Sequence, residues 1–496
     1  RLFVMQGNRM IALDVATGMP SKGFGENGTI TVGVPYSGTP TVYRNVVVIG
    51  AATNEVPQGP AGNPRAFDAR TGKKLWEFQT VPKPGQKYND TWGDGWKDRS
   101  GANMWGISAA IDAQRGIVYV PIAGPAANYY GGDRPGNDVY ANSIVAVDAE
   151  TGKYKWHFQT VHHDIWDSDM PSVGTLVDIK VNGKTIPAIV NVGKTSWVYI
   201  LDRVTGKPVF GVEERPVPKG NVPTEWYSPT QPFPVKPARP LSRVDFNVDR
   251  DLVRPEDTSE AHVEACKAVM AKNGGFMNEG PFTPFLYHED GAPPKSTIQF
   301  PGGIGGVNWG GTAGDPTTGI IYVQAHDTSL IGWVEKKKPG VTYSFEAVGS
   351  NQPYDRASVD GVGPFHSFTA PLDPSNPRSV QLPCQRPPWA RLTAVDANTG
   401  EILWAVPVGE TPQLPEGKRK TGNAASAGAS VTAGGLVFVG ASDRKLYAFD
   451  SKSGKELWSG DTGKPVNANP MTFEGKDGKQ YVAVTATDTV TVFGLP

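Results

Sequence analysis

A short phrase that recurs along the chain constrains its fold more than any other feature. Its copies are IALDVATG (11–18), RAFDARTGKKLWEFQT (65–80), VAVDAETGKYKWHFQT (145–160), YILDRVTGKPVF (199–210), TAVDANTGEILWAVPV (393–408) and YAFDSKSGKELWSGDT (447–462). The phrase is an apolar strand ending in Asp, a turn closed by Thr-Gly or Ser-Gly, and a second strand that typically carries Trp. We expect the Asp to accept hydrogen bonds from turn amides, the Gly to adopt positive φ and the Trp to pack as a large apolar group.

The segments before the copies extend this pattern into a repeating β architecture. Another apolar strand precedes most copies, as in RNVVVIGAA, GIVYVPIAG, AIVNVGK and GLVFVGASD. Each unit is therefore a small antiparallel sheet that cannot bury both of its faces alone, and stacking such units radially gives a β-propeller. The phrase is missing between residues 211 and 392, where the chain is irregular and rich in Pro, although TGIIYVQAHD (318–327) still reads as a strand.

The sequence predicts one domain over residues 1–496, with two long irregular inserts at about 211–300 and 330–390. Apolar residues at helical spacing predict a helix over 258–273. The only two cysteines, Cys266 and Cys384, lie one in each insert. Their spacing alone allows two buried thiols or one long-range disulfide. Because both inserts flank the same units, we expect a disulfide, with Cα atoms about 4.4–6.8 Å apart.

Composition excludes some classes of partner. The chain has 48 Lys and Arg against 49 Asp and Glu, a net charge of −1, so we expect neither nucleic acid nor an anionic membrane surface as a partner. It has no run of 18 apolar residues, which predicts no membrane span within it. The N-terminus, RLFVMQGNRM, lacks an apolar signal core and is interpreted as belonging to a processed or trimmed chain.

The stretch VHHDIWDSDM (161–170) gathers two of the seven histidines and three aspartates. By itself such a cluster could bind a metal, transfer protons or cap turns. If the stretch is extended, side chains alternate, so Asp167 and Asp169 would share one face and Asp164 would point away.

These segments resemble the tryptophan-docking repeat and the connecting motifs of dehydrogenases that use pyrroloquinoline quinone (PQQ). The most specific stretches are TWGDGWKDRSGANMWG (91–106), YYGGDRPGNDVYANSIVAVD (129–148), VHHDIWDSDMP (161–171), GKTSWVYILDR (193–203), PTQPFP (229–234), FPGGIGGVNWGG (300–311) and PMTFEGKDGKQYVAV (470–484). The resemblance covers nearly the whole chain and is greatest to the branch like membrane glucose dehydrogenase. It implies an all-β, eight-bladed propeller, with the first blade incomplete at the N-terminus, early strands pairing with late ones and the site at the central axis.

The resemblance also assigns roles to the 161–170 stretch. Asp167 matches the catalytic base, which takes the substrate hydroxyl proton as hydride passes to the quinone. Lys194 matches the cation that hydrogen-bonds the quinone oxygens and stabilises charge there. His162, His163 and Asp164 are expected to hold the loop by hydrogen bonds. The alternative is that the aspartates only cap turns.

The metal ligands implied by the resemblance are Glu55, Asp167 and Asp169, since Ca²⁺ prefers carboxylate oxygens. Asp169 matches a position that marks lanthanide-using relatives, but glucose-type relatives, which resemble calcium or magnesium enzymes, also carry Asp there, so Ca²⁺ is favoured over a lanthanide and Mg²⁺ stays open. The family's ligand Asn is replaced by Gly124, and it is open whether the nearby Asn128 compensates.

Four further residues are expected to hold the cofactor together with Lys194. Trp105 matches the Trp that stacks beneath the PQQ ring, Asn103 lies two residues before it, and Asn308 and Trp309 stand in the Gly-rich GGVNWGG stretch. The competing interpretation is a core Trp and ordinary turns. Two features depart from the family: the chain has no Cys-Cys pair, and it lacks the loop of glucose-type relatives near the last strand, which weakens glucose as the substrate.

The leading hypothesis is a periplasmic PQQ-dependent dehydrogenase that oxidises an alcohol, polyol or sugar hydroxyl to a carbonyl. Its electrons would pass to an external acceptor, a quinone or a cytochrome c, because the chain has no CxxCH haem motif. The alternatives are a non-catalytic propeller that serves as a binding or assembly scaffold, and an enzyme-derived propeller that has lost PQQ.

Overall fold

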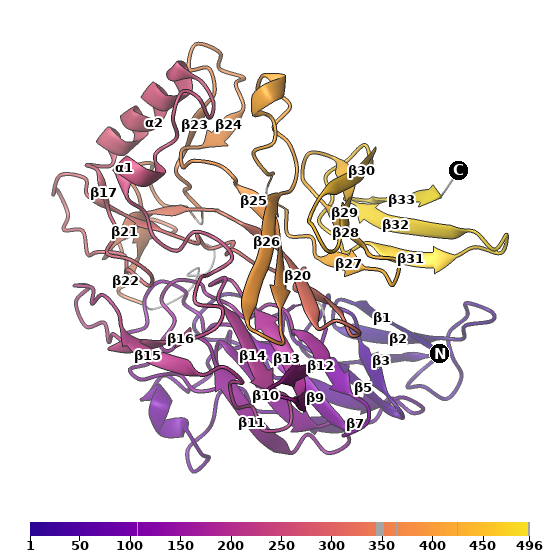
Figure 1. The fold of residues 1–496 in the computed structure, drawn as a ribbon. Coiled ribbons are helices and arrows are strands. Elements are labelled where there is room, and N and C mark those ends of the chain that lie inside the picture. The colour runs from indigo at the N-terminus through magenta and orange to yellow at the C-terminus, as the bar shows by residue number, and fades with distance from the viewer. Residues whose placement is uncertain (107, 344–351, 364, 424, 495–496) are drawn as a thin grey trace.

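The computed structural model describes residues 1–106, 108–343, 352–363, 365–423 and 425–494. The predicted all-β class is confirmed, with 37% strand and 5% helix. The described residues form five four-stranded, three three-stranded and two two-stranded sheets (Figure 1).

The N-terminal half forms four sheets in chain order. They are β1 (Leu2–Gln6), β2 (Arg9–Leu13) and β3 (Thr29–Thr31); β4 (Thr41–Tyr43), β5 (Val46–Ile49), β6 (Arg65–Asp68) and β7 (Lys74–Glu77); β8 (Ala110–Asp112), β9 (Ile117–Ile122), β10 (Ser143–Asp148) and β11 (Tyr154–Gln159); and β12 (Thr175–Val181), β13 (Lys184–Val192) and β14 (Val198–Asp202). Neighbouring strands pair antiparallel, as a meander with short connections requires.

In the C-terminal half two sheets recruit strands that are distant in sequence. One contains β17 (Phe276–Met277), β18 (Ser296–Gln299), β21 (Leu330–Lys336) and β22 (Tyr354–Ala357), and the other β19 (Thr312–Asp315), β20 (Ile320–His326), β25 (Ala390–Asp396) and β26 (Glu401–Pro407). The last two sheets are β27 (Ala429–Val431), β28 (Leu436–Gly440), β29 (Lys445–Asp450) and β30 (Glu456–Asp461), then β31 (Met471–Glu474), β32 (Gln480–Ala486) and β33 (Thr489–Gly494). The small hairpins are β15 (Val212–Pro216) with β16 (Thr230–Pro234), and β23 (Thr369–Pro371) with β24 (Gln381–Pro383).

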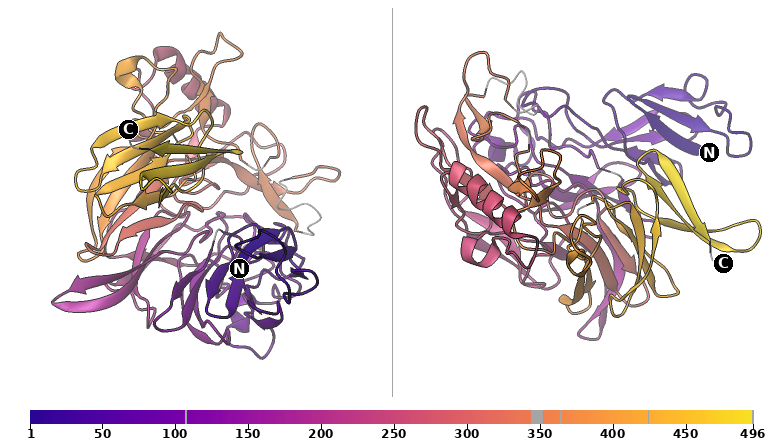
Figure 2. Two further views of the ribbon diagram at one scale, coloured as in Figure 1. Left: turned by 90° about the vertical axis from the view of Figure 1, so that its right-hand side faces the viewer. Right: turned by 90° about the horizontal axis from the view of Figure 1, so that it is seen from above.

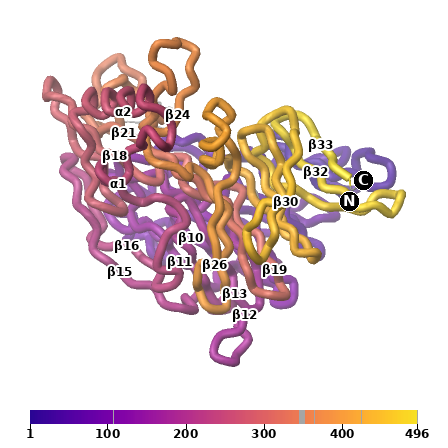
Figure 3. The backbone as a smooth tube through the Cα atoms, turned by 45° about the horizontal axis from the view of Figure 1, so that its top comes forward, coloured from indigo at the N-terminus to yellow at the C-terminus, as the bar shows by residue number. Residues whose placement is uncertain are grey.

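The two terminal sheets lie on the same side of the molecule (Figures 2 and 3). The expectation that early strands pair with late ones is wrong for the described residues, because β1–β3 and β31–β33 form separate sheets. Both sheets leave apolar side chains exposed, among them Leu2 and Val490.

The recurring turn has the geometry that its residues predict. In the copy at 145–160 the Asp148 carboxylate accepts from the amides of Glu150 and Thr151, and Gly152 has φ of 69°. The other copies place their Asp and Gly in the same way. The segment TAGDPTTG (312–319) forms a further copy, with Asp315 accepting from the Thr317 amide and Gly319 at φ of 75°. Its strand was recognised from the sequence, but its turn was not.

The tryptophans of the repeat contact the next unit along the chain. Trp156 donates from Nε1 to the Arg203 carbonyl at 3.1 Å and covers Gly206, where a Cβ atom would lie 2.6 Å from the indole. Trp76 makes the same pair of contacts with Ala149 and Gly152. The glycine of the turn therefore has two functions: it takes positive φ, and it leaves room for the indole of the preceding unit.

The insert at 211–300 contains both α-helices of the described part of the chain. Helix α1 spans Val248–Asp251 and helix α2 spans Glu260–Lys272, within the predicted 258–273. Short 3₁₀ turns lie elsewhere, at Asn89–Trp92 and Glu416–Lys418. Ser259 caps α2 by accepting from the His262 amide. The predicted disulfide is present: Cys266 on α2 is bonded to Cys384, with Cα atoms 5.5 Å apart.

None of the described helices is long and apolar enough to span a membrane.

Candidate functional site

A cavity of about 160 Å³ brings together residues that follow successive strands of the N-terminal half. Its predicted members are Glu55, Asn103, Trp105, Asp167 and Asp169. Glu55 comes after β5, Gly124 after β9 and the 161–170 stretch after β11, so the repeat places these loops at one end of neighbouring sheets. Thr53, Gly124 and Asn128 also line the cavity.

Lys194, which follows β13, joins the two aspartates of the cavity. Its Nζ lies 2.8 Å from Asp167 Oδ1 and 2.9 Å from Asp169 Oδ2. All three side chains are nearly buried, at 8%, 8% and 12% exposure for Lys194, Asp167 and Asp169. Removing one member of such a buried group is strongly destabilising, because it leaves an uncompensated buried charge.

The carboxylates of Asp167 and Asp169 both face Lys194, as the prediction of a shared face requires. The reason is not an extended backbone. Asp167 has φ of 59°, in the left-handed region, and residues 162–173 form no strand. A non-glycine residue there is strained and persists only where its surroundings fix it. Asp164 points elsewhere, with Oδ2 accepting from Asn142 Nδ2 at 2.9 Å and from the Ser168 amide at 2.8 Å.

The electrostatics of the pair follow from burial. Burial raises the pKa of Asp167 well above its ordinary value; the charge of Lys194 opposes this rise, and Asp169 and Glu55 add to it. Burial alone would lower the pKa of Lys194, but Asp167 and Asp169 outweigh it and raise that pKa. The site therefore holds a permanently charged ammonium beside a carboxylate that is a stronger base than an exposed aspartate.

The structure explains why residue 124 is a glycine. Its amide donates to Asp169 Oδ1 at 2.8 Å and so orients that carboxylate. A Cβ atom at this position would lie 2.5 Å from Asp164 Oδ2 and 3.4 Å from Asn142 Nδ2. The space of a larger side chain is thus taken by the Asp164–Asn142 pair.

A buried network of hydrogen bonds and ion pairs supports the 161–170 stretch. Arg134 donates to the Asp164 carbonyl at 2.6 Å and pairs with Asp138. His163 contacts Glu225 through Nε2 at 3.0 Å and the Gly136 carbonyl through Nδ1 at 2.9 Å. Burial would lower the pKa of His163, but its hydrogen bonds to Asp138 and Glu225 prevail and raise it. The expected holding function of His163 and Asp164 agrees with these contacts.

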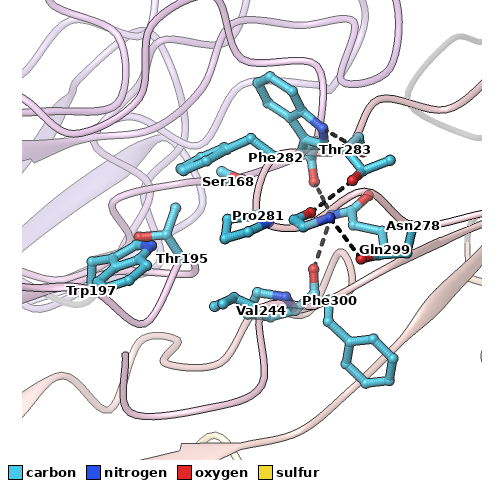
Figure 4. Close-up of a pocket in the computed structure, with 13 residues that line it drawn as sticks. Ser168, Thr195, Trp197, Val244, Asn278, Pro281, Phe282, Thr283, Gln299 and Phe300 are labelled. Carbon is cyan, nitrogen blue, oxygen red and sulfur yellow. Dashed lines mark hydrogen bonds between the residues drawn. The ribbon is translucent and has the colours of Figure 1, made fainter. Parts of the chain in front are cut away.

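Gln299 also holds this loop (Figure 4). Its Nε2 donates to the Trp166 carbonyl at 2.8 Å and to the Pro301 carbonyl at 3.0 Å, which ties the loop of Asp167 to the 300–306 loop. Trp166 donates from Nε1 to the Thr283 carbonyl. These residues enclose a cavity of about 20 Å³, lined also by Ser168 and Thr195. Gln299 is a support that the sequence analysis did not find.

Asn308 and Trp309 lie outside the cavity. Asn308 donates to the Ile304 carbonyl at 2.7 Å, and Trp309 donates to the Asn467 carbonyl at 3.0 Å. Their loop does reach the site, because Gly306 donates to the Lys194 carbonyl and a Cβ atom on Gly305 would lie 2.4 Å from the Lys194 side chain. Their contact with a cofactor stays a prediction.

The carboxylates alone do not form a metal cage in the described part of the chain. The one group of three or more metal-ligating side chains within 4.8 Å there is His262, Cys266 and Cys384, and its cysteines are joined as a disulfide. Glu55, Asp167 and Asp169 line one cavity without converging that tightly. The carboxylates available suit a hard cation that takes further oxygen ligands from another molecule.

Thr53 was also missed by the sequence analysis. Its Oγ1 accepts from Asn103 Nδ2 at 2.8 Å and from the Gly101 amide at 3.2 Å, so it positions the loop that carries Asn103 and Trp105. Its only sequence signal is its place after the apolar strand, two residues before Glu55.

Comparison with known proteins identifies the family of the chain. A family model described as "PQQ: Glucose/ethanol/alcohol dehydrogenase, beta-propeller domain" matches residues 1–482. The chain is 33% identical to quinate/shikimate dehydrogenase (quinone) of Acinetobacter baylyi, over 96% of this chain and 59% of the relative. It is 32% identical to the glycerol dehydrogenase large subunit of Gluconobacter oxydans (98% and 68%) and 30% identical to quinoprotein glucose dehydrogenase of Escherichia coli (96% and 60%). It thus spans about three fifths of the length of the first of these relatives.

Solved structures support the fold. Quinohemoprotein alcohol dehydrogenase from Comamonas testosteroni superposes with a TM-score of 0.63 at 24% identity, covering 98% of this chain and 61% of that one. A europium-containing methanol dehydrogenase gives a TM-score of 0.63 at 22% identity, covering 97% and 70%.

The sheet architecture and the family match define a β-propeller protein of the quinoprotein type. The chain belongs to the family of PQQ-dependent glucose, ethanol and alcohol dehydrogenases, and represents its β-propeller domain.

Proposed function

We propose that this chain is the catalytic domain of a PQQ-dependent dehydrogenase that oxidises an alcohol, polyol or sugar hydroxyl to a carbonyl. The observation that carries the proposal is the cavity that unites Asp167, Asp169, Glu55, Asn103 and Trp105, with Lys194 paired to both aspartates. The family membership supports the same reaction class. So do the relatives, which are named as dehydrogenases of quinate or shikimate, of glycerol and of glucose.

The residues of the cavity suit an anionic quinone and a hard cation. Trp105 is half-buried and offers a flat apolar face, Lys194 offers a buried positive charge, and Glu55 and Asp169 offer carboxylate oxygens. Ca²⁺ is the proposed ion, held by Glu55, Asp167 and Asp169 beside the cofactor, with a lanthanide as the less favoured choice. PQQ, when bound, supplies an acceptor for the two electrons that leave the substrate carbon.

The chain's own residues would perform the proton chemistry. Asp167 Oδ2 is free of the Lys194 contact, which uses Oδ1, so this carboxylate has an oxygen available for a substrate hydroxyl proton. Its raised pKa makes it a better proton acceptor, and Lys194 stabilises negative charge that develops beside it. Burial of both side chains strengthens each of these interactions.

The proposal includes an architecture and a location. The contacts of Trp76 and Trp156 with the following units, and eight sheets of three or four strands among the described residues, support an eight-bladed, tryptophan-docked propeller over 1–496. An oxidising periplasmic location accords with the Cys266–Cys384 disulfide. The electron acceptor is proposed to be an external quinone or cytochrome c.

A direct test titrates the purified chain with PQQ and Ca²⁺, follows Trp fluorescence, and then measures dye-linked oxidation of glucose, glycerol, quinate and simple alcohols. We expect saturable PQQ binding and oxidation of at least one of these classes. Binding without any oxidation would favour the non-catalytic scaffold, and absence of PQQ binding would contradict the proposal.

A further inference from the structure

A glycine-rich turn that follows β18 packs against the Asp167–Lys194 pair. It is closed by a hydrogen bond from the Gly305 amide to the Gly302 carbonyl at 2.7 Å. A Cβ atom on Gly305 would lie 2.4 Å from the Lys194 side chain, and one on Gly303 would lie 3.1 Å from Asp167 Oδ2. A side chain at residue 303 would therefore crowd the carboxylate oxygen that does not bond to Lys194.

Asp167 Oδ2 can accept a hydrogen bond from a small molecule. The carboxylate meets Lys194 through Oδ1, and among the described residues Oδ2 has no hydrogen-bond partner. Oδ2 is nevertheless not one of the fully buried oxygens that lack a partner, so it keeps some accessible surface. It thus combines an unused lone pair with access from outside, as a proton acceptor requires.

Phe365 brings an exposed aromatic ring close to this oxygen. The Cβ position of Gly303 lies 2.6 Å from Phe365 Cε1 as well as 3.1 Å from Asp167 Oδ2, so the ring edge and the oxygen are within about 6 Å of each other. Phe365 is 41% exposed, whereas Tyr129, whose hydroxyl borders the same position, is 3% exposed. Of these two side chains, the phenyl ring is therefore the one that a small molecule can contact.

We propose that Phe365 is a specificity-determining residue, which favours alcohols with a bulky apolar substituent on the carbon that carries the hydroxyl. A hydroxyl that donates to Asp167 Oδ2 at about 2.7 Å holds its carbon about 3.5 Å from that oxygen. Substituents on this carbon then reach van der Waals contact with a ring edge about 6 Å from the oxygen. Phe365 acts in this way only if Asp167 is the base of the proposed function, on which the inference rests.

The experiment compares cyclohexanol with propan-2-ol as substrates of the full chain reconstituted with PQQ and Ca²⁺. Both are secondary alcohols, so they present the same reacting group to Asp167 and differ in apolar surface. Phe365→Ala should lower the ratio of their kcat/KM values about tenfold, mainly through a higher KM for cyclohexanol, because the lost contact serves binding. Inactive protein reduces both rates equally, so partial misfolding leaves the ratio unchanged.

Phe473→Ala is the matched control. Phe473 is exposed to a similar degree, 38%, but it lies on β31 in the C-terminal sheet, where its ring stacks on Tyr481. Its replacement should leave the ratio at the wild-type value. Phe365→Leu keeps a large apolar side chain and should lower the ratio less than Phe365→Ala does.

The outcomes separate this inference from the proposed function. An unchanged ratio in Phe365→Ala, or an equal fall in Phe473→Ala, would overturn the inference and leave the proposed function standing. Oxidation of glucose, glycerol or quinate by a wild-type chain that oxidises neither alcohol would also overturn it, because the site would then not accept the apolar class. No oxidation of any substrate while PQQ is bound would remove the proposed function and the inference together.

Discussion

Asp167 and Lys194 form a pair in which each side chain depends on the other. Burial raises the pKa of Asp167, and the nearby ammonium limits that rise while the aspartates keep Lys194 charged. The left-handed backbone of Asp167 adds strain that the surrounding bonds of Asp164, His163 and Gln299 must offset.

The first prediction separates the base from the cation. Asp167→Asn keeps the size of the side chain but removes the proton acceptor, so turnover with an artificial electron acceptor should fall about 10²–10⁴-fold while bound PQQ is retained. Lys194→Ala should reduce both turnover and PQQ retention, because it removes a charge-assisted hydrogen bond and leaves two buried carboxylates unpaired. Near-full activity of reconstituted Asp167→Asn would show that the 161–170 stretch is only a turn.

The second prediction concerns Gly124. Gly124→Asn introduces the residue that the family resemblance leads one to expect there. It should lower the free energy of unfolding by about 1–3 kcal/mol, because the new Cβ would overlap Asp164 Oδ2. Displacement of Asp169 should also weaken Ca²⁺-dependent PQQ binding. Thermal unfolding and PQQ titration measure both effects. Gly434→Asn is the control, since Gly434 is exposed with open space around its Cβ position; equal effects of the two substitutions would contradict the argument.

At the scale of single elements, β11 carries the docking Trp156 and a partly buried histidine. His157 Nδ1 contacts the Tyr154 hydroxyl at 2.9 Å, and the ring packs edge-on against Tyr88 and Tyr140. Burial, aided by the charge of Lys87, lowers the pKa of His157 from 6.5 to about 4. The folded state therefore favours the neutral ring.

The third prediction is the pH dependence that follows. The unfolded chain binds a proton at this histidine below about pH 6.5 and the folded chain only near pH 4, so the stabilisation is complete above 6.5 and is lost as the pH falls towards 4. His157→Phe keeps a ring but cannot titrate, and its free energy of unfolding should decline less over this window, by no more than about 3 kcal/mol. Denaturant unfolding at several pH values measures the difference; parallel curves for variant and wild type would refute it.

At the scale of the whole molecule, the disulfide joins two inserts that are distant in sequence. Cys266 and Cys384 are 118 residues apart, fully buried, and packed with Ile298 and Phe368 in one cluster. The bond therefore connects α2 with the segment that follows β24.

The fourth prediction tests this link. Cys266→Ala combined with Cys384→Ala should lower the free energy of unfolding by about 2–5 kcal/mol, because the unfolded chain loses a cross-link over a long loop. Thermal unfolding with and without reductant measures it, and the double variant should be insensitive to reductant. Two free thiols in the denatured, unreduced wild type would contradict the bond.

Much of the local structure was determined by the sequence itself. Asp, Thr and Gly at fixed positions specify the repeating turn, because Asp148 and its equivalents bond to amides only two and three residues away and Gly152 needs no distant partner to take positive φ. Helix α2 was likewise predictable from its apolar spacing. Family motifs then identified Asp167, Lys194, Glu55 and Trp105 as candidates.

Only the tertiary structure decided how these candidates meet. The left-handed φ of Asp167, the exclusion of a side chain at Gly124 by Asp164, and the support from Gln299 all depend on residues that are distant in the chain. It also placed Asn308 and Trp309 outside the cavity lining and, among the described residues, left the two terminal sheets unpaired with each other. Local propensities fix short-range hydrogen bonds, whereas buried ion pairs and close packing depend on the positions of several sheets at once, which no single stretch of sequence encodes.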